Sequence, residues 1–399
     1  MFKNKKYSPL IIVAVWVIIT AGCANSHIDE NILPGAYDTE QYLPLLLNKK
    51  VGIVANYTSV INSTNVVDTL TLLGINIRAI YTPEHGFRGT SDAGAAVSDT
   101  VYSTSNIPVY SLYGNKKKPD KKQLEGIDIM IFDLQDVGVR FYTYLSTLHY
   151  IMEACAERQI PILVLDRPNP NGYYIDGPVL DLKFRSFVGL HPVPIVYGMT
   201  IGEYALMING EGWLPDSLCC ELKIIKCRNY THSSFYELPV PPSPNLPEMK
   251  AIYLYPSVAL FEGTVVSEGR GTEYPFELIG HPDYPVHDFS FIPHSLKGYS
   301  LNPKFRDRTC YGTDLRNLPV DSIRNFKRIN LSYLKEFYSK LKLNGDFFSG
   351  YFDLLAGNDA LREQIEERVS IQDIYKSWEE GLVAFKKIRV KYLLYPDFE

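Results

Sequence analysis

Residues 127–166 read IDIMIFDLQDVGVRFYTYLSTLHYIMEACAERQIPILVLD, and this stretch decides the fold. It begins and ends with a mostly apolar run of strand length, at 127–133 and 161–166. Between them, residues 142–158 predict an amphipathic helix, because apolar side chains recur every three or four residues: Leu145, Leu148, Met152 and Cys155. A strand, a helix and a second strand predict a βαβ unit, and near-continuous apolar strands indicate a parallel sheet covered on both faces.

The same alternation continues on both sides of this unit. Before it, we expect strands at 51–55 and 76–81 with a helix at 64–73, and after it a helix at 200–209 and a strand at 222–226. The sequence therefore predicts an α/β fold with a Rossmann-like, mostly parallel sheet in residues 41–240.

A proline-rich segment follows, LPVPPSPNLP at residues 238–247. Five prolines in ten residues exclude a helix or a central strand, so we expect a domain boundary here. Residues 248–399 would form a second, smaller α+β domain. It ends in a helix whose apolar stripe runs from Ile371 to Ile388, with Ser370 and Asp373 as its N-terminal cap.

The N-terminus has the pattern of a targeting segment. Lysines precede an apolar run, and small residues precede Cys23, which predicts a signal peptide at 1–22 and a lipid-modified Cys23. Residues 23–40 would tether the fold to the lipid. We expect an exported protein, anchored in the bacterial cell envelope and facing the periplasm. The other five cysteines show no C-x-x-C spacing, which favours neither a metal site nor a disulfide framework. A disulfide among Cys219, Cys220 and Cys227 stays open at this point.

Composition and missing motifs exclude several functions. The 399 residues are 46% apolar and 21% charged, which is typical of a globular protein, and the formal net charge of −5 does not favour a nucleic-acid partner. The sequence contains no nicotinamide fingerprint, phosphate loop, G-x-S-x-G elbow or H-E-x-x-H motif. We expect no cofactor and no metal.

Polar residues gather where three predicted strands end. Ligands of open parallel sheets bind outside the carboxyl ends of the strands. The three loops at 82–89, 135–142 and 166–172 should therefore form one site, with these candidate residues: Glu84, His85, Arg88, Gln135, Asp136, Arg140, Tyr142, Arg167 and Asn169.

Glu84 is the sharpest candidate in these loops. It follows a proline and precedes His85 and Gly86, and the glycine permits a tight bend that aims the carboxyl into a cleft. A glutamate in a partly apolar cleft is suited to act as a general acid. The alternative is a surface ion pair between Glu84 and Arg88.

A further cluster lies beyond the proline-rich segment. Glu262, Glu268 and Arg270 stand among glycines that allow close backbone approach, and Asn245 is held between prolines at the expected junction. We expect this cluster to close over the strand-end loops. A carboxylate-rich cleft without a cofactor, in an exported protein with 29 tyrosines, favours glycoside hydrolysis.

Four motifs together resemble the family of NamZ-type exo-β-N-acetylmuramidases. They are TPEHGFRG at 82–89, DLQDVGVRFYTY at 133–144, DRPNP at 166–170 and FEGT…SEGRGT within 261–272. The resemblance implies a Rossmann-like domain, a smaller C-terminal domain and a cleft between them. It also implies removal of N-acetylmuramic acid from the non-reducing end of peptidoglycan-derived disaccharides or muropeptides. The family's catalytic glutamate matches Glu84. The family's Asn-Pro-Thr-Gly loop is replaced by Asn56-Tyr57-Thr58, with Asn56 as a substrate-binding candidate.

Two assignments stay open at this point. The second catalytic group is Asp136, Glu262, Glu268 or a tyrosine such as Tyr142, and the separation of the carboxyl groups would decide between retention and inversion. The lactyl carboxylate of N-acetylmuramic acid needs a cation, for which the candidates are Arg88, Arg140, Arg167 and Arg270, with Arg140 preferred. The alternative function is a lipid-anchored, two-lobed protein that binds a sugar or muropeptide without catalysis.

Overall fold

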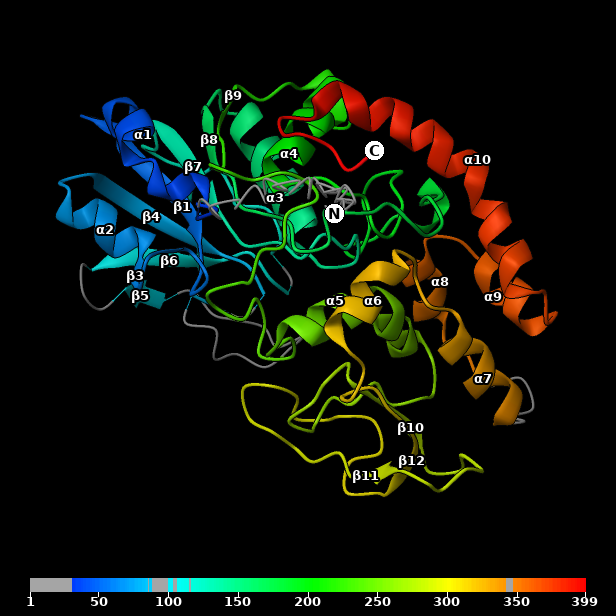
Figure 1. Cartoon of the computed structure of the whole chain (residues 1–399). Helices are drawn as coiled ribbons and strands as arrows, with labels where there is room; N and C mark the ends of the chain where they lie inside the picture. The colour runs from blue at the N-terminus through cyan, green and yellow to red at the C-terminus, as the bar shows by residue number, and fades with distance from the viewer. Residues whose placement is uncertain (1–30, 85, 88–99, 103–105, 115, 342–346) are drawn as a thin grey trace, which may run out of the picture. The chain divides into compact units, whose positions relative to one another are not determined.

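The computed structural model describes residues 31–84, 86–87, 100–102, 106–114, 116–341 and 347–399. Its centre is a seven-stranded sheet in the order β5-β6-β4-β1-β7-β8-β9 (Figure 1). All neighbouring strands are parallel except β5, which runs antiparallel to β6. In chain order, the strands are β1 (Lys50–Ala55), β4 (Asn76–Thr82), β5 (Thr100–Tyr102), β6 (Ile107–Ser111), β7 (Ile129–Asp133), β8 (Ile162–Leu165) and β9 (Leu222–Ile225).

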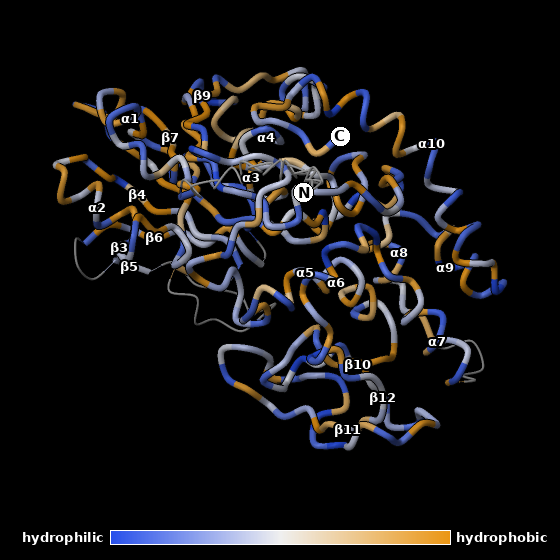
Figure 2. Tube along the Cα trace, viewed as in Figure 1, coloured by the Kyte–Doolittle hydropathy of each residue, from blue (hydrophilic) through white to orange (hydrophobic). Residues whose placement is uncertain are grey.

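Helices cover both faces of this sheet, because side chains alternate along each strand. Ile129 and Ile131 of β7 pack in one core with α1 (Thr39–Leu46) and α2 (Val66–Leu72). Met130 and Phe132 pack in the other core with α3 (Tyr144–Ala156) and α4 (Ile201–Gly210). Figure 2 shows hydrophobic residues running through the strands of this sheet. The predicted Rossmann-like sheet is therefore confirmed.

The elements expected from the sequence are present, and their ends differ by only a few residues. Local caps explain some of these ends. Asn65 accepts a hydrogen bond from the backbone of Val67 at the start of α2, and Thr200 and Glu203 form a capping box on α4. The structure adds β5 and β6 at one edge of the sheet, which the sequence analysis did not predict, and a short hairpin of β2 (Val60–Ile61) and β3 (Thr64–Asn65).

The residues after the proline-rich segment form a smaller α+β part. It contains an antiparallel sheet in the order β10-β12-β11, and as expected residues 238–247 contain no helix or extended strand. Ser370 caps the last helix through the backbone of Asp373, as predicted. The elements of this part are α5 (Met249–Val258), β10 (Leu278–His281), β11 (Ser290–Phe291), β12 (Cys310–Asp314), α6 (Val320–Phe326), α7 (Ser332–Lys340), α8 (Gly350–Ala356), α9 (Ala360–Glu366) and α10 (Ile371–Arg389). Short 3₁₀ turns lie at Gly35–Tyr37, Leu182–Phe184, Pro215–Ser217, Ala259–Gly263 and Val390–Tyr392.

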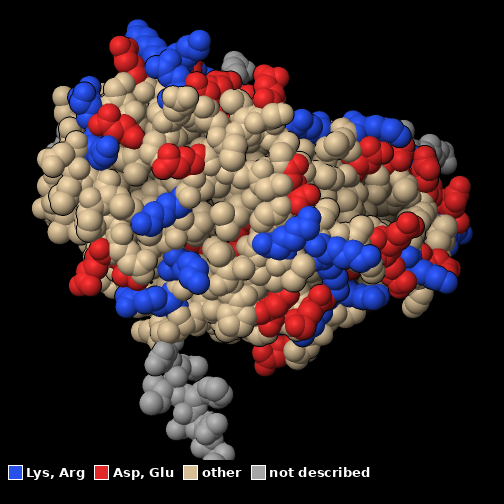
Figure 3. All heavy atoms as spheres, turned by 90° about the horizontal axis from the view of Figure 1, so that it is seen from above, with Lys and Arg blue, Asp and Glu red and all other residues tan. Residues whose placement is uncertain are grey.

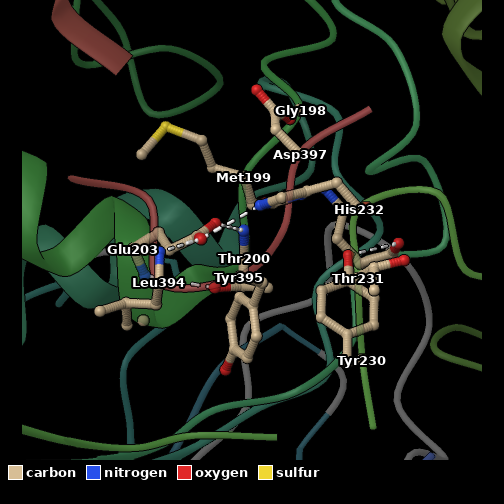
Figure 4. Close-up of polar contacts among 12 residues, drawn as sticks. Gly198, Met199, Thr200, Glu203, Tyr230, Thr231, His232, Leu394, Tyr395 and Asp397 are labelled. Carbon is tan, nitrogen blue, oxygen red and sulfur yellow. Dashed lines mark hydrogen bonds and ion pairs between the residues drawn. The ribbon is translucent and has the colours of Figure 1, made fainter. Parts of the chain in front are cut away.

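After α10 the chain returns to the parallel sheet. The Tyr395 hydroxyl donates to Oδ2 of Asp166 at 2.6 Å, next to the end of β8, and the backbone N–H of Leu394 donates to Oε1 of Glu203 at 2.7 Å. The backbone N–H of His232 donates to the carbonyl of Pro396 at 3.0 Å. Figure 4 shows Leu394, Tyr395, Glu203 and His232 side by side. We call residues 394–397 and their partners the C-terminal clasp.

Three further features are the absence of a membrane-spanning helix among the described residues, the distribution of surface charge and the state of the cysteines. Among the described residues, no helix is long and apolar enough to cross a membrane. On the face in Figure 3, side chains of both charges are interspersed. The five described cysteines are free thiols: Cys155, Cys219, Cys220, Cys227 and Cys310. Cys23 lies outside the described residues.

Candidate active site

A pocket lies where the strand-end loops meet the proline-rich segment and the C-terminal part. Glu84 comes from the loop after β4, residues 141–143 come from the loop between β7 and α3, and Tyr144 is the first residue of α3. The remaining lining residues follow residue 240: Ser243, Asn245, Leu246, Tyr255, Arg270 and Phe276. Of the cluster expected to close over the strand-end loops, Arg270 lines this pocket together with Glu84, whereas Glu262 and Glu268 do not line it.

The carboxyl group of Glu84 is held by neighbouring hydroxyl groups. The Thr143 hydroxyl donates to its Oε2 at 3.5 Å. Burial, the negative charge of Glu84 and a hydrogen bond to Glu84 together raise the pKa of Tyr113, so this phenol keeps its proton and donates to Glu84. Gly86 adopts the left-handed conformation with φ of 75°, which the predicted tight bend requires. His85 and Arg88 lie outside the described residues.

Arg270 stands at the centre of an ion-pair cluster. Its Nε and Nη2 donate to Oε1 of Glu262 at 2.9 and 2.5 Å, and Nε lies 3.6 Å from Oε1 of Glu268. The other oxygen of Glu268 accepts from Nζ of Lys304 at 3.1 Å. Burial raises the pKa of Glu262, opposed by the charge of Arg270. Glu262 and Glu268 therefore lie beside the pocket as partners of cations.

Arg140 does not have the predicted place. Its Nη1 donates to the carbonyls of Pro178 and Val193, and its Nη2 to those of Leu355 and Ala356, at 2.7 to 2.9 Å. The side chain is buried and does not line the pocket. The prediction that Arg140 binds a substrate carboxylate is wrong, because both ends of its fork already hold backbone carbonyls.

Arg167 and Asn169 also act inside the fold. The Arg167 guanidinium donates to both carboxylate oxygens of Asp133, at 2.5 and 3.0 Å, and this ion pair is buried. Asn169 donates to the carbonyl of Met199 and accepts from the backbone N–H of Asn171, both at 2.8 Å. Neither residue lines the pocket, which corrects their assignment as substrate ligands.

Asp136 and Gln135 are buried and do not line the pocket. One carboxylate oxygen of Asp136 accepts from the backbone N–H of Gly138 at 2.7 Å and from the Tyr197 hydroxyl. Burial raises the pKa of Asp136 to about 7, against the lowering effect of these bonds. Gln135 donates to the carbonyls of Asp136 and Pro168 at 2.9 and 2.8 Å. The structure therefore does not support Asp136 as a catalytic group or Gln135 as a substrate ligand.

Asn56 contacts a residue that lines the pocket, and Tyr142 lines the pocket itself. Asn56 is buried and donates to the hydroxyl of Tyr144 at 2.8 Å, so it supports a tyrosine that lines the pocket without lining it itself. Tyr142 lines the pocket, and its hydroxyl donates to the carbonyl of Pro242 at 2.8 Å.

Sequence reasoning missed several residues of this site. Thr143 and Tyr144 lie inside a motif that it quoted, and their position next to Tyr142 was an available signal. Tyr113, Tyr255, Phe276 and Lys304 carried no local signal, because only the packing of distant segments brings them to Glu84 and Arg270.

Two models of one protein family match the sequence of this chain. The family model described as exo-β-N-acetylmuramidase NamZ, N-terminal, matches residues 51–250, and the corresponding C-terminal model matches residues 253–395. The chain belongs to the NamZ family of exo-β-N-acetylmuramidases. Glu84 falls in the first match and Arg270 in the second, so both parts of the NamZ family pattern contribute to the pocket.

Individual relatives cover nearly the whole chain. It is 39% identical over 374 residues to the peptidoglycan β-N-acetylmuramidase NamZ of Bacillus subtilis, with 89% of each sequence covered. Among solved structures, a DUF1343 family protein of Bacteroides fragilis matches with a TM-score of 0.86 and 46% identity, over 92% of this chain and 99% of that one. A second such protein from the same organism matches with a TM-score of 0.76 and 28% identity, over 91% and 99%.

Proposed function

We propose that this protein is an exo-acting glycoside hydrolase that removes N-acetylmuramic acid from the non-reducing end of peptidoglycan fragments, in cell-wall turnover or recycling. Its substrates are peptidoglycan-derived disaccharides or muropeptides. The observation that carries the proposal is the pocket that joins Glu84 to Arg270, in a chain of the NamZ family. The Bacillus subtilis relative is a peptidoglycan β-N-acetylmuramidase by name.

In this proposal Glu84 is the general acid. Its carboxyl group gives a proton to the glycosidic oxygen as the bond to the anomeric carbon breaks, and water supplies the oxygen that the anomeric carbon gains. Tyr113 and Thr143 hold the carboxyl group in place through their hydroxyls. The second catalytic group of a glycoside hydrolase is commonly another carboxylate, and Glu262 and Glu268, beside Arg270, are the candidates for it.

The test is hydrolysis of a chromogenic N-acetylmuraminide by the wild type and by Glu84→Gln. The variant keeps the shape of the side chain but lacks the proton, and we expect its kcat to fall by about 10²- to 10⁴-fold. Glu125→Gln on the exposed surface is the matched control and should retain full activity. A wild type that binds N-acetylmuramic acid but never cleaves the substrate would favour the alternative of a sugar-binding protein.

We also propose that the protein is exported and held in the cell envelope by a lipid on Cys23, facing the periplasm. The support is the sequence pattern of residues 1–23. Cys23→Ser should abolish incorporation of labelled fatty acid and move the protein from the membrane to the soluble fraction. Unchanged labelling of this variant would refute the anchor.

A further inference from the structure

Two buried polar atoms of the pocket lack a hydrogen-bond partner among the described residues. One is Nη1 of Arg270, which is a donor, and the other is Oδ1 of Asn245, which is an acceptor. Both residues line the pocket that contains Glu84. Buried polar groups are nearly always paired in proteins, so an unpaired donor and an unpaired acceptor in one pocket indicate a ligand that supplies both partners.

The donor is fixed in direction. Glu262 holds Nε and Nη2 of Arg270, and the guanidinium lies over the ring of Phe276, 5.1 Å from its centre. Because a guanidinium is planar, holding two of its nitrogen atoms fixes the third. The direction of Nη1 is therefore fixed before a ligand arrives.

The acceptor is fixed as well. Nδ2 of Asn245 donates to the carbonyl of Tyr299 at 3.0 Å, and its backbone N–H donates to the hydroxyl oxygen of Ser243 at 3.1 Å. Exchanging the oxygen and nitrogen of this amide would place two acceptors face to face, so this bond assigns the unpaired atom as the oxygen. Pro244 and Pro247 restrict the backbone on either side.

The charges around Arg270 favour a neutral ligand group. Glu262 and Glu268 carry two negative charges, and Arg270 and Lys304 carry two positive charges, so the cluster is formally neutral. A carboxylate would gain little long-range attraction from it, and removing a carboxylate from water costs far more than removing a neutral carbonyl. A secondary amide is a neutral group that accepts through its carbonyl oxygen and donates through its N–H, so its two separate atoms match the separate donor and acceptor of this pocket.

We propose that Arg270 and Asn245 bind the 2-acetamido group of the sugar to be removed. The amide carbonyl accepts from Nη1 of Arg270, and the amide N–H donates to Oδ1 of Asn245. The methyl group packs against apolar side chains of the same pocket: Phe141, Leu246 and Phe276. This assignment rests on the proposed function, because it takes the substrate to be N-acetylmuramic acid. It makes these two residues specificity determinants for the N-acetyl group and separates them from recognition of the lactyl carboxylate.

The test compares the binding of three sugars by titration calorimetry, without requiring catalysis. They are N-acetylmuramic acid, its analogue with a hydroxyl group at position 2, and N-acetylglucosamine, which lacks the lactyl group. We expect the wild type to bind N-acetylmuramic acid at least about 100-fold more tightly than the 2-hydroxy analogue. Arg270→Lys and Asn245→Leu should each reduce this ratio by about 10-fold or more. Neither variant should change the preference for N-acetylmuramic acid over N-acetylglucosamine by more than about 2-fold.

Arg306→Lys and Asn302→Leu, on the exposed surface, are matched controls that should keep the wild-type ratios. Circular dichroism establishes that each variant is folded, and if Asn245→Leu is not, the result for Arg270→Lys decides. Unchanged acetamido selectivity in the folded variants overturns the assignment. So does a loss of selectivity for the lactyl group in Arg270→Lys, which would make Arg270 the carboxylate ligand. Failure of the proposed function is a separate result, namely a wild type that does not hydrolyse the muraminide.

Discussion

Arg140→Lys should lower the stability of the protein while leaving its catalysis intact. The guanidinium of Arg140 donates hydrogen bonds to four backbone carbonyls. Two belong to Pro178 and Val193, and two belong to residues 355–356. Burial lowers its pKa to about 9, so the group is still charged at neutral pH. A lysine ammonium is compact and reaches only one of the two carbonyl pairs.

The size of the effect follows from the bonds that are lost. Two charge-assisted hydrogen bonds disappear, and each is worth at least about 1.5 kcal/mol in a buried site, which gives a loss of about 3 kcal/mol. Thermal and urea unfolding of the wild type, Arg140→Lys and the surface control Arg306→Lys would measure it. The value of kcat/KM for a muraminide at 25 °C should stay within about 2-fold of the wild type. A large rise in KM with unchanged stability would refute this reasoning and restore Arg140 as a substrate ligand.

Three further predictions concern other parts of the molecule. Tyr113→Phe removes a donor to Glu84 and should lower kcat about 10-fold with little change in melting temperature. A large fall in melting temperature together with the fall in kcat would contradict a positioning role. Tyr395→Phe removes the clasp hydroxyl from buried Asp166 and should cost about 1–3 kcal/mol of unfolding free energy, more than the control Tyr392→Phe, whose hydroxyl bonds the partly exposed Glu211. Burial raises the pKa of Asp136 from 3.8 to about 7, so the folded protein holds a proton that the unfolded chain releases, and stability falls as pH rises between these values. Asp136→Asn should remove this contribution, so its melting temperature relative to the wild type should increase from pH 4 to pH 7; a pH-independent difference would refute it.

The sheet and most helices could be predicted because their signals are local. The sequence pattern of residues 127–166 alone predicts β7, α3 and β8. The edge strand β6 was missed because Pro108 and two polar-tipped residues, Tyr110 and Ser111, interrupt its apolar pattern.

The sequence predicted a site residue correctly only where the local sequence determines the position of that residue. Glu84 and Arg270 do line one pocket, because the ends of parallel strands and the cluster after the proline-rich segment converge there. Arg140 lies in an equally polar loop, but its partners are up to 216 residues away in the chain. No local pattern distinguishes an arginine that binds a substrate from one that binds four carbonyls, and the same holds for Arg167 beside Asp133.

The C-terminal clasp means that the peptide chain crosses between the α/β part and the C-terminal part twice. Residues 238–247 make the first crossing, and the return after α10 makes the second, with Tyr395 on Asp166 and Leu394 on Glu203. A single cut in the proline-rich segment would therefore not release two free halves. The two fragments would stay together through the clasp and through the bonds of Arg140 to residues 355–356, and would purify as one complex until the protein is unfolded.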